Sequence, residues 1–87
     1  MSDKYHATGR QIAAGRTLAG IAQAELALSA SISVPTLRRM EASEGPANGM
    51  ANNVAAVMRA LEAAGVIFIA ENGDGPGVRL RKDPAAS

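Results

Sequence analysis

The side chains of this sequence best suited to chemistry are two adjacent arginines, Arg38 and Arg39. They follow Ser33, a residue type that favours the N-cap of a helix, and Pro35, which fits the first helical turn. Neighbouring guanidinium groups on a short helix offer one fork for the N7 and O6 atoms of guanine and another for a phosphate. The spacing therefore predicts a helix that contacts a polyanion.

Catalytic and metal-binding sites are not expected from the other residue types. The chain has no cysteine, and its one histidine, His6, has no second histidine at ligand spacing. The glycine-rich stretch 73–77 lacks the Lys-Ser/Thr pair and the following helix of a phosphate-binding loop. We therefore expect no enzyme activity, no cofactor and no metal ion.

Length and composition favour one small domain. A chain of 87 residues buries only about 60% of the surface that its unfolded form exposes, and much of its 47% hydrophobic content is alanine. No apolar run is long enough to span a bilayer, so we expect a soluble protein of the cytoplasm, with no membrane partner. The first 40 residues carry five basic and two acidic side chains, and the rest carry four and six. The N-terminal half is therefore expected to face the polyanion.

Helix signals dominate the first 65 residues. Thr8-x-x-Gln11 is a capping box, and Gly20 is the residue type that ends a helix in the left-handed conformation. Ile12 and Leu18 are expected on the inner face of this first helix. The four predicted helices cover about residues 9–19, 23–30, 34–41 and 52–64.

The second and third predicted helices are joined by a short turn. Their inward positions are apolar, and a small residue at Ala27 lets the two helices cross closely. Such a pair forms a compact unit whose second helix protrudes enough to enter the major groove of DNA. The expected inward residues are Leu26, Ala27, Ile32, Leu37 and Met40.

The C-terminal part changes character. Residues 66–69 are β-branched and aromatic, residues 78–81 alternate apolar with basic, and the turn residues between them indicate a β-hairpin. The prediction is a mainly α domain: a flexible arm at 1–7, four helices within 8–65, a hairpin within 66–82 and a disordered tail at 83–87.

Three segments carry a resemblance to a known family. They are residues 15–20, residues 23–27 (Gln-Ala-Glu-Leu-Ala) and residues 33–41 (Ser-Val-Pro-Thr-Leu-Arg-Arg-Met-Glu). Together they resemble the xenobiotic-response-element and phage-repressor (Cro/C1-type) helix-turn-helix family of small bacterial transcription regulators. Residues 61–66 and 71–81 are similar to the members with a β-tail. The resemblance covers about residues 8–82 and implies a repressor-like helix-turn-helix domain.

The resemblance also implies roles for individual residues. Gln23 would bond a DNA phosphate, and Arg16 and Glu41 would form a buried structural salt bridge. Ser31 stands where the family usually has glycine, so some strain is expected in the turn. The residues implied to face base edges are Val34, Pro35 and Arg39; those implied to lie at or near the DNA backbone are Ser33, Thr36 and Arg38. The loop after the third helix lacks the Lys or Arg usual in the family, so phosphate contacts there are expected from Asn48, Asn52 and Asn53.

The function implied is sequence-specific binding of double-stranded DNA, with localisation at the nucleoid when bound. One short helix reaches few base edges, so a homodimer reading an inverted repeat with the helix at 34–41 is expected. The hairpin within 66–82 or the fourth helix is the expected dimer surface, because a small helical core would leave part of the apolar strand 66–69 uncovered. The alternative is a protein–protein interaction module, such as an antiactivator or antitoxin, built on the same fold.

Overall fold

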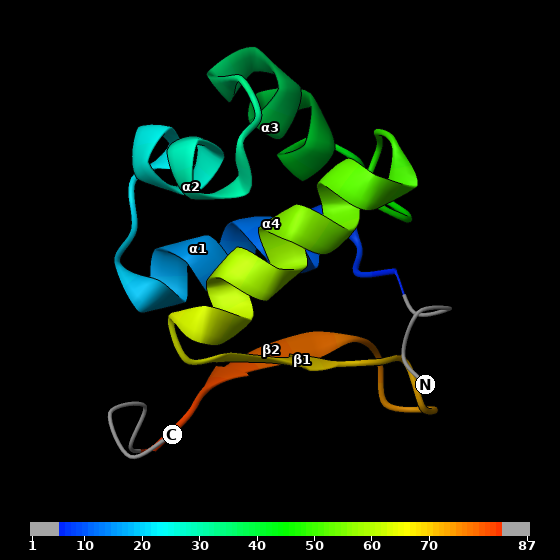
Figure 1. Ribbon diagram of the computed structural model, residues 1–87. Coiled ribbons are helices and arrows are strands. Elements are labelled where there is room, and N and C mark those ends of the chain that lie inside the picture. The colour runs from blue at the N-terminus through cyan, green and yellow to red at the C-terminus, as the bar shows by residue number, and fades with distance from the viewer. Residues whose placement is uncertain (1–5, 83–87) are drawn as a thin grey trace.

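The structure, a computed structural model, describes residues 6–82 and contains four helices and one two-stranded antiparallel sheet (Figure 1). The expectations for residues 1–5 of the arm and for the tail at 83–87 lie outside the described residues. The helices are α1 (Gly9–Ala19), α2 (Gln23–Ala30), α3 (Val34–Glu41) and α4 (Ala51–Ala63), and the strands are β1 (Val66–Ile69) and β2 (Gly77–Leu80).

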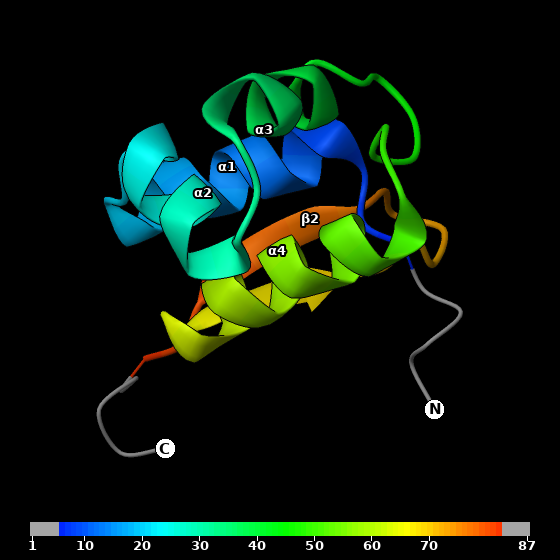
Figure 2. The same ribbon diagram turned by 45° about the horizontal axis from the view of Figure 1, so that its top comes forward.

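The elements form three layers. Figure 1 shows α2 and α3 at one end, α1 and α4 in the middle and the hairpin at the other end. The hairpin pairs Val66 with Leu80 and Phe68 with Val78. Figure 2 shows the same order from a second direction, with α2 and α3 together on the side of α1 and α4 that lies away from the hairpin. The mainly helical architecture predicted from the sequence is thus confirmed.

Local signals place the helix ends. The Thr8 hydroxyl accepts from the Gln11 N–H while the Gln11 side chain accepts from the Thr8 N–H, which completes the capping box. Gly20 adopts the left-handed conformation (φ 73°) and ends α1. The Ser33 hydroxyl accepts from the Thr36 N–H at the start of α3. These contacts explain why the predicted bounds of α1 and α3 agree with the structure.

The core lies between the four helices and extends to the hairpin, which α1 and α4 contact. Four of the five residues expected to point inward from the second and third helices are buried, and Ile32 is half-buried against them. The largest fully buried side chains are Ile12, Leu26, Leu37, Met40, Val54, Val57 and Leu61.

The expectation that Leu18 faces inward is wrong. Its residue surface is 48% exposed. It lies two turns after Gln11 on the same side of α1, beyond the point where Gly15 packs against Val66. Leu18 therefore borders an open groove beside the hairpin instead of the core.

The start of the described chain is also held by packing. Ala7 is fully buried, and its carbonyl accepts a hydrogen bond from the Ala47 N–H at 3.0 Å. Thr8 forms an isolated bridge with Pro46. The packed structure thus includes Ala7, within the segment 1–7 that was expected to be a flexible arm. No helix between residues 6 and 82 has both the length and the apolar character needed to cross a membrane.

A tight contact at Gly9 gives a prediction about stability. A Cβ at Gly9 would overlap the carbonyl oxygens of Met40 and Ser43, whereas a Cβ at Gly45 meets nothing within 4 Å. Because backbone atoms cannot move aside cheaply, Gly9→Ala should lower the free energy of unfolding by about 1–3 kcal/mol. Gly45→Ala, the matched control, should change it by less than about 0.5 kcal/mol. Urea unfolding followed by circular dichroism measures both, and equal midpoints would contradict the packing.

Candidate nucleic-acid interface

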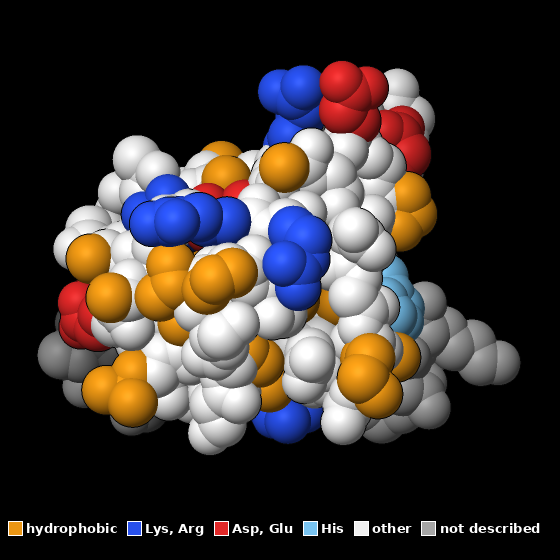
Figure 3. All heavy atoms as spheres, turned by 90° about the horizontal axis from the view of Figure 1, so that it is seen from above, with side chains coloured by type: hydrophobic (Ala, Val, Ile, Leu, Met, Phe, Trp, Pro, Cys, Tyr) orange, Lys and Arg blue, Asp and Glu red, His pale blue; other side chains and the backbone are white. Residues whose placement is uncertain are grey.

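Helix α3 carries the candidate surface because its two sides differ in polarity. Leu37 and Met40 are fully buried and fix the helix to the core. Pro35, Arg38 and Arg39 are exposed on the other side. Viewed from above, this end of the molecule shows blue basic groups separated by white and orange side chains (Figure 3). The positive charge therefore forms separate spots and no continuous basic patch on this face.

The turn before α3 contains the one positive φ of a non-glycine residue within residues 6–82. Ser31 has φ 60° and ψ 41°, and its N–H bonds back to the carbonyl of Leu28. The Ile32 N–H reaches the carbonyl of Ala27 at 3.0 Å. These two bonds close the C-terminal end of α2 in the way that glycine usually permits. The serine side chain therefore occupies a left-handed position at a cost of about 1 kcal/mol.

A salt bridge connects α1 to α3. The Arg16 Nε donates to Glu41 at 2.7 Å, and its Nη2 donates to the other carboxylate oxygen at 3.2 Å. The third nitrogen, Nη1, donates to the carbonyl of Ile21 in the loop before α2. The side chains of Arg16 and Glu41 are only 19% and 8% exposed. One guanidinium thus holds α1, the following loop and α3 together, and this confirms the predicted pairing.

Gln23 extends this ion pair toward the surface. Its amide nitrogen donates to Glu41 at 3.0 Å, and its amide oxygen accepts from the Arg38 Nε at 3.4 Å. The bonds to Glu41 and Arg38 agree on one orientation of the amide, and one of its two N–H groups stays available for a ligand. The hydrogen-bonded chain Arg16–Glu41–Gln23–Arg38 runs from the interior to an exposed guanidinium.

The hydroxyls at the start of α3 are engaged with one another. Besides capping the helix, the Ser33 hydroxyl donates to the Thr36 hydroxyl at 2.8 Å. The Arg39 Nη2 donates to the same Thr36 oxygen at 3.4 Å. This places Thr36 as a support for Arg39, one turn along the helix, and leaves Ser33 mainly in a capping role.

The apolar candidates on α3 differ in exposure. Val34 is half-buried and packs against the core, whereas Pro35 is exposed. Side chains at both positions lack hydrogen-bonding groups, so any contact they make with a ligand is apolar. A thymine methyl group is the base feature that suits such a surface.

Asn52 and Asn53 lie apart from the α3 cluster. They occupy the first turn of α4, whose N-cap is Met50 with no side-chain hydrogen bond. The Asn53 N–H is already bonded to the Met50 carbonyl at 2.9 Å. The hydrogen bonds within residues 6–82 include none between these asparagines and α3. The structure therefore brings together the α3 residues with Gln23 and leaves the α4 residues as a separate group.

No family model matches the chain, and no curated protein matches it significantly. The interface must therefore be judged on its own geometry and charge. Within the part of the chain that the structure describes, no group of three His, Cys, Asp or Glu side chains is placed to hold a metal ion.

One buried polar residue has a role that the sequence reading missed. Gln11 is 4% exposed, and its amide nitrogen donates to the carbonyls of Ile69 and Gly77 at 2.9 Å each. The sequence pattern predicts for it only a place in the capping box. Its second set of partners lies 58 and 66 residues away, and no local signal announces contacts at that separation.

Proposed function

We propose that this chain is a sequence-specific DNA-binding transcription regulator in which α2 and α3 form a helix-turn-helix and α3 enters the major groove. The observation that carries the proposal is the polarity of α3. Leu37 and Met40 anchor the helix, while Pro35, Arg38 and Arg39 are exposed on its other side, and neither arginine forms an ion pair within residues 6–82. A short helix fixed to the core, with exposed guanidinium groups, is suited to reading base edges.

In the proposed complex the α3 residues divide between bases and phosphates. Arg39 places its fork on a guanine, and the apolar surface at Val34 and Pro35 meets a thymine methyl group. Arg38 and the remaining N–H of Gln23 bind phosphate oxygens and fix the register of the helix. The hydrogen-bonded chain to Glu41 supports this assignment, because it holds the Gln23 amide in one orientation before DNA arrives.

Symmetry completes the proposal. One short helix contacts few base pairs, and a genome offers many competing sites. Two copies that bind half-sites about one helical turn apart multiply the contacts and read an inverted repeat. We therefore propose that the active species is a homodimer.

Selection from a library of random DNA duplexes tests the function directly. The full chain should enrich an inverted repeat with half-sites separated by about 10 base pairs. Binding to the enriched duplex, followed by fluorescence anisotropy, should weaken steeply between about 50 and 200 mM salt because counterions are released from the phosphates. A selection that enriches no sequence would reject the proposal. A protein–protein module would in addition bind its partner through an interface that salt affects little.

A further inference from the structure

The outer edge of β2 is open for strand pairing. The Arg81 N–H donates to the Gly65 carbonyl at 2.7 Å, and residues in an antiparallel ladder alternate between bonded and non-bonded pairs. It follows that Val78 and Leu80 turn their N–H and C=O groups away from β1. The sheet has two strands, so no third strand within residues 6–82 accepts these groups. An edge of this kind is a template for another strand.

An apolar groove runs beside this edge. It is lined by Ala13, Ala14, Thr17 and Leu18 of α1 and by Val78 of β2. Leu18 is 48% exposed, and Leu80, which lies on the same face of the hairpin as Val66, is 37% exposed. Because its lining residues come from α1 and from Val78 of β2, the groove belongs to the β2 side of the sheet. The edge therefore offers apolar contacts together with backbone hydrogen bonds.

Charge along this segment is self-complementary. The turn before β2 carries Glu71 and Asp74, and the end of β2 and the residues after it carry Arg79, Arg81 and Lys82. When such a strand pairs antiparallel with a second copy of itself, the acidic start of each copy lies beside the basic end of the other. This pattern identifies a second copy as the partner that suits the edge.

We propose that two copies of this chain associate through their β2 edges, with Val78 of each copy opposite Val78 of the other, to form one four-stranded antiparallel sheet. The inference rests on the proposed homodimer and names its interface. Within the hairpin it selects the β2 edge, because Val66 of β1 lies in the core and Phe68 packs against it. The Val78 side chains of the two copies then fill the groove beside α1.

Charge also selects this register. Centred on Val78, the pairing sets Arg79 opposite Gly77 of the second copy and Lys82 near its Asp74. Moving the centre by one residue toward the C-terminus would set Arg79 directly opposite Arg79 of the second copy, and like charges in that position destabilise a sheet. The Val78-centred register therefore avoids the repulsion between arginines that the Arg79-centred register contains.

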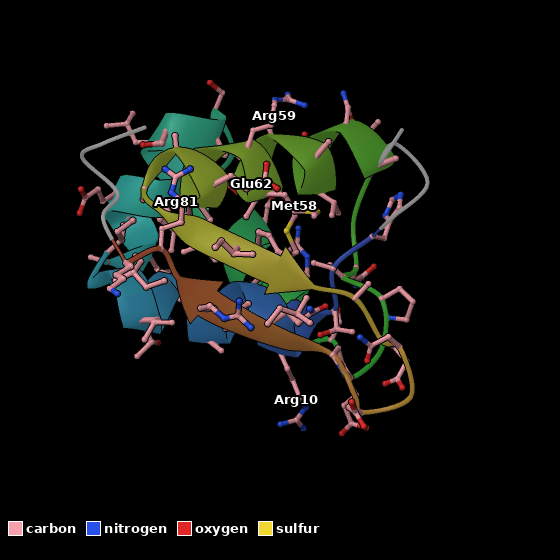
Figure 4. The ribbon with its side chains drawn as sticks, turned by 90° about the horizontal axis from the view of Figure 1, so that it is seen from below. Arg10, Met58, Arg59, Glu62 and Arg81 are labelled. Carbon is pink, nitrogen blue, oxygen red and sulfur yellow. The ribbon has the colours of Figure 1, made fainter. Side chains whose placement is uncertain are left out.

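The surroundings of the edge permit this approach. Figure 4 shows the hairpin from its outer side, with no helix in front of it and with Arg10 beyond β2, pointing away from the strand. Arg10 forms an exposed ion pair with Glu44 at 3.8 Å, so an acidic group already faces it. The pairing brings the two α1 helices together, and the short side chains of Ala13 and Ala14 favour their close contact.

Cysteine cross-linking tests both the interface and its register, since the chain has no cysteine of its own. In the Val78-centred pair the two Val78 Cα atoms are about 5.5 Å apart, a separation that a disulfide spans. Under mild oxidation Val78→Cys should form a covalent dimer. Arg79→Cys, the matched control, should form no disulfide-linked dimer because its sulfurs are diagonal across the pair. Equal cross-linking of both variants, or of neither, would overturn the inference.

A charge exchange provides a second test that leaves the core untouched, because Asp74 and Lys82 are exposed. In sedimentation equilibrium, Asp74→Lys should weaken dimerisation about 3- to 10-fold, and Asp74→Lys combined with Lys82→Glu should restore it. Failure of the combined variant to recover would count against the interface. Circular dichroism of each variant verifies folding.

The two proposals fail in different ways. A chain that selects DNA but stays monomeric overturns the interface and keeps the function. A cross-linked dimer that selects no DNA keeps the interface and overturns the function.

Discussion

Replacing Glu41 with alanine should lower the free energy of unfolding by about 3–5 kcal/mol, because it leaves the Arg16 guanidinium largely buried without its counter-charge. Arg16 would keep only its bond to the Ile21 carbonyl, and Gln23 would lose the acceptor for its amide nitrogen. Urea unfolding followed by circular dichroism measures the effect. The predicted loss is a large part of the stability of a domain this small.

The chain contains a matched control for that experiment. Arg10 and Glu44 form the other ion pair of the described residues, at 3.8 Å, with side chains 75% and 87% exposed. Because water screens an exposed pair, Glu44→Ala should cost less than about 1 kcal/mol. Similar losses for Glu41→Ala and Glu44→Ala would show that burial of the Arg16 pair does not matter, contrary to our expectation.

Replacing Arg39 with alanine should weaken binding to the selected duplex by about 1–3 kcal/mol and relax the preference at one base position. The physical reason is the loss of a two-point contact with guanine, which alanine cannot replace. Affinities for the selected duplex and for its single-base variants, measured by fluorescence anisotropy at one salt concentration, give both numbers.

Arg59→Ala is the control for charge alone. Arg59 is an exposed arginine on α4, outside the α3 surface (Figure 4). Its removal should weaken binding to every duplex slightly and leave base preferences unchanged. If Arg39→Ala behaves in the same way, with equal losses of affinity for selected and random DNA, then Arg39 contacts a phosphate and the proposed contact with guanine is wrong.

Local chemistry explains how much of the fold the sequence predicts. Thr8 and Ser33 cap the starts of α1 and α3 through hydrogen bonds to backbone groups three residues ahead, and Gly20 ends α1 by adopting a left-handed conformation. The resemblance to a known family predicts the pairing of Arg16 with Glu41, because both residues lie in segments that carry this resemblance. Predictions of this kind need no knowledge of which elements pack together.

The remaining features depend on how distant elements meet. Leu18 lies at an apolar position of the helical repeat of α1, but its exposure depends on how much of the helix the hairpin covers. Val34 is likewise half-buried because of the way α3 packs against the core. The bond from Gln23 to Glu41 spans 18 residues and joins two helices. Periodicity and spacing describe residues that are close in the sequence. They therefore do not predict contacts between distant elements.

The two bonds from the Gln11 amide to the hairpin have a consequence for how the molecule opens. An isolated two-stranded hairpin is marginally stable, and here its turn end is tied to the same side chain that caps α1. Unfolding the first turn of α1 therefore releases the hairpin, and detaching the hairpin exposes the Gln11 amide. The N-terminal turn and the C-terminal strands, far apart in the chain, form one cooperative unit whose amide hydrogens exchange with solvent together.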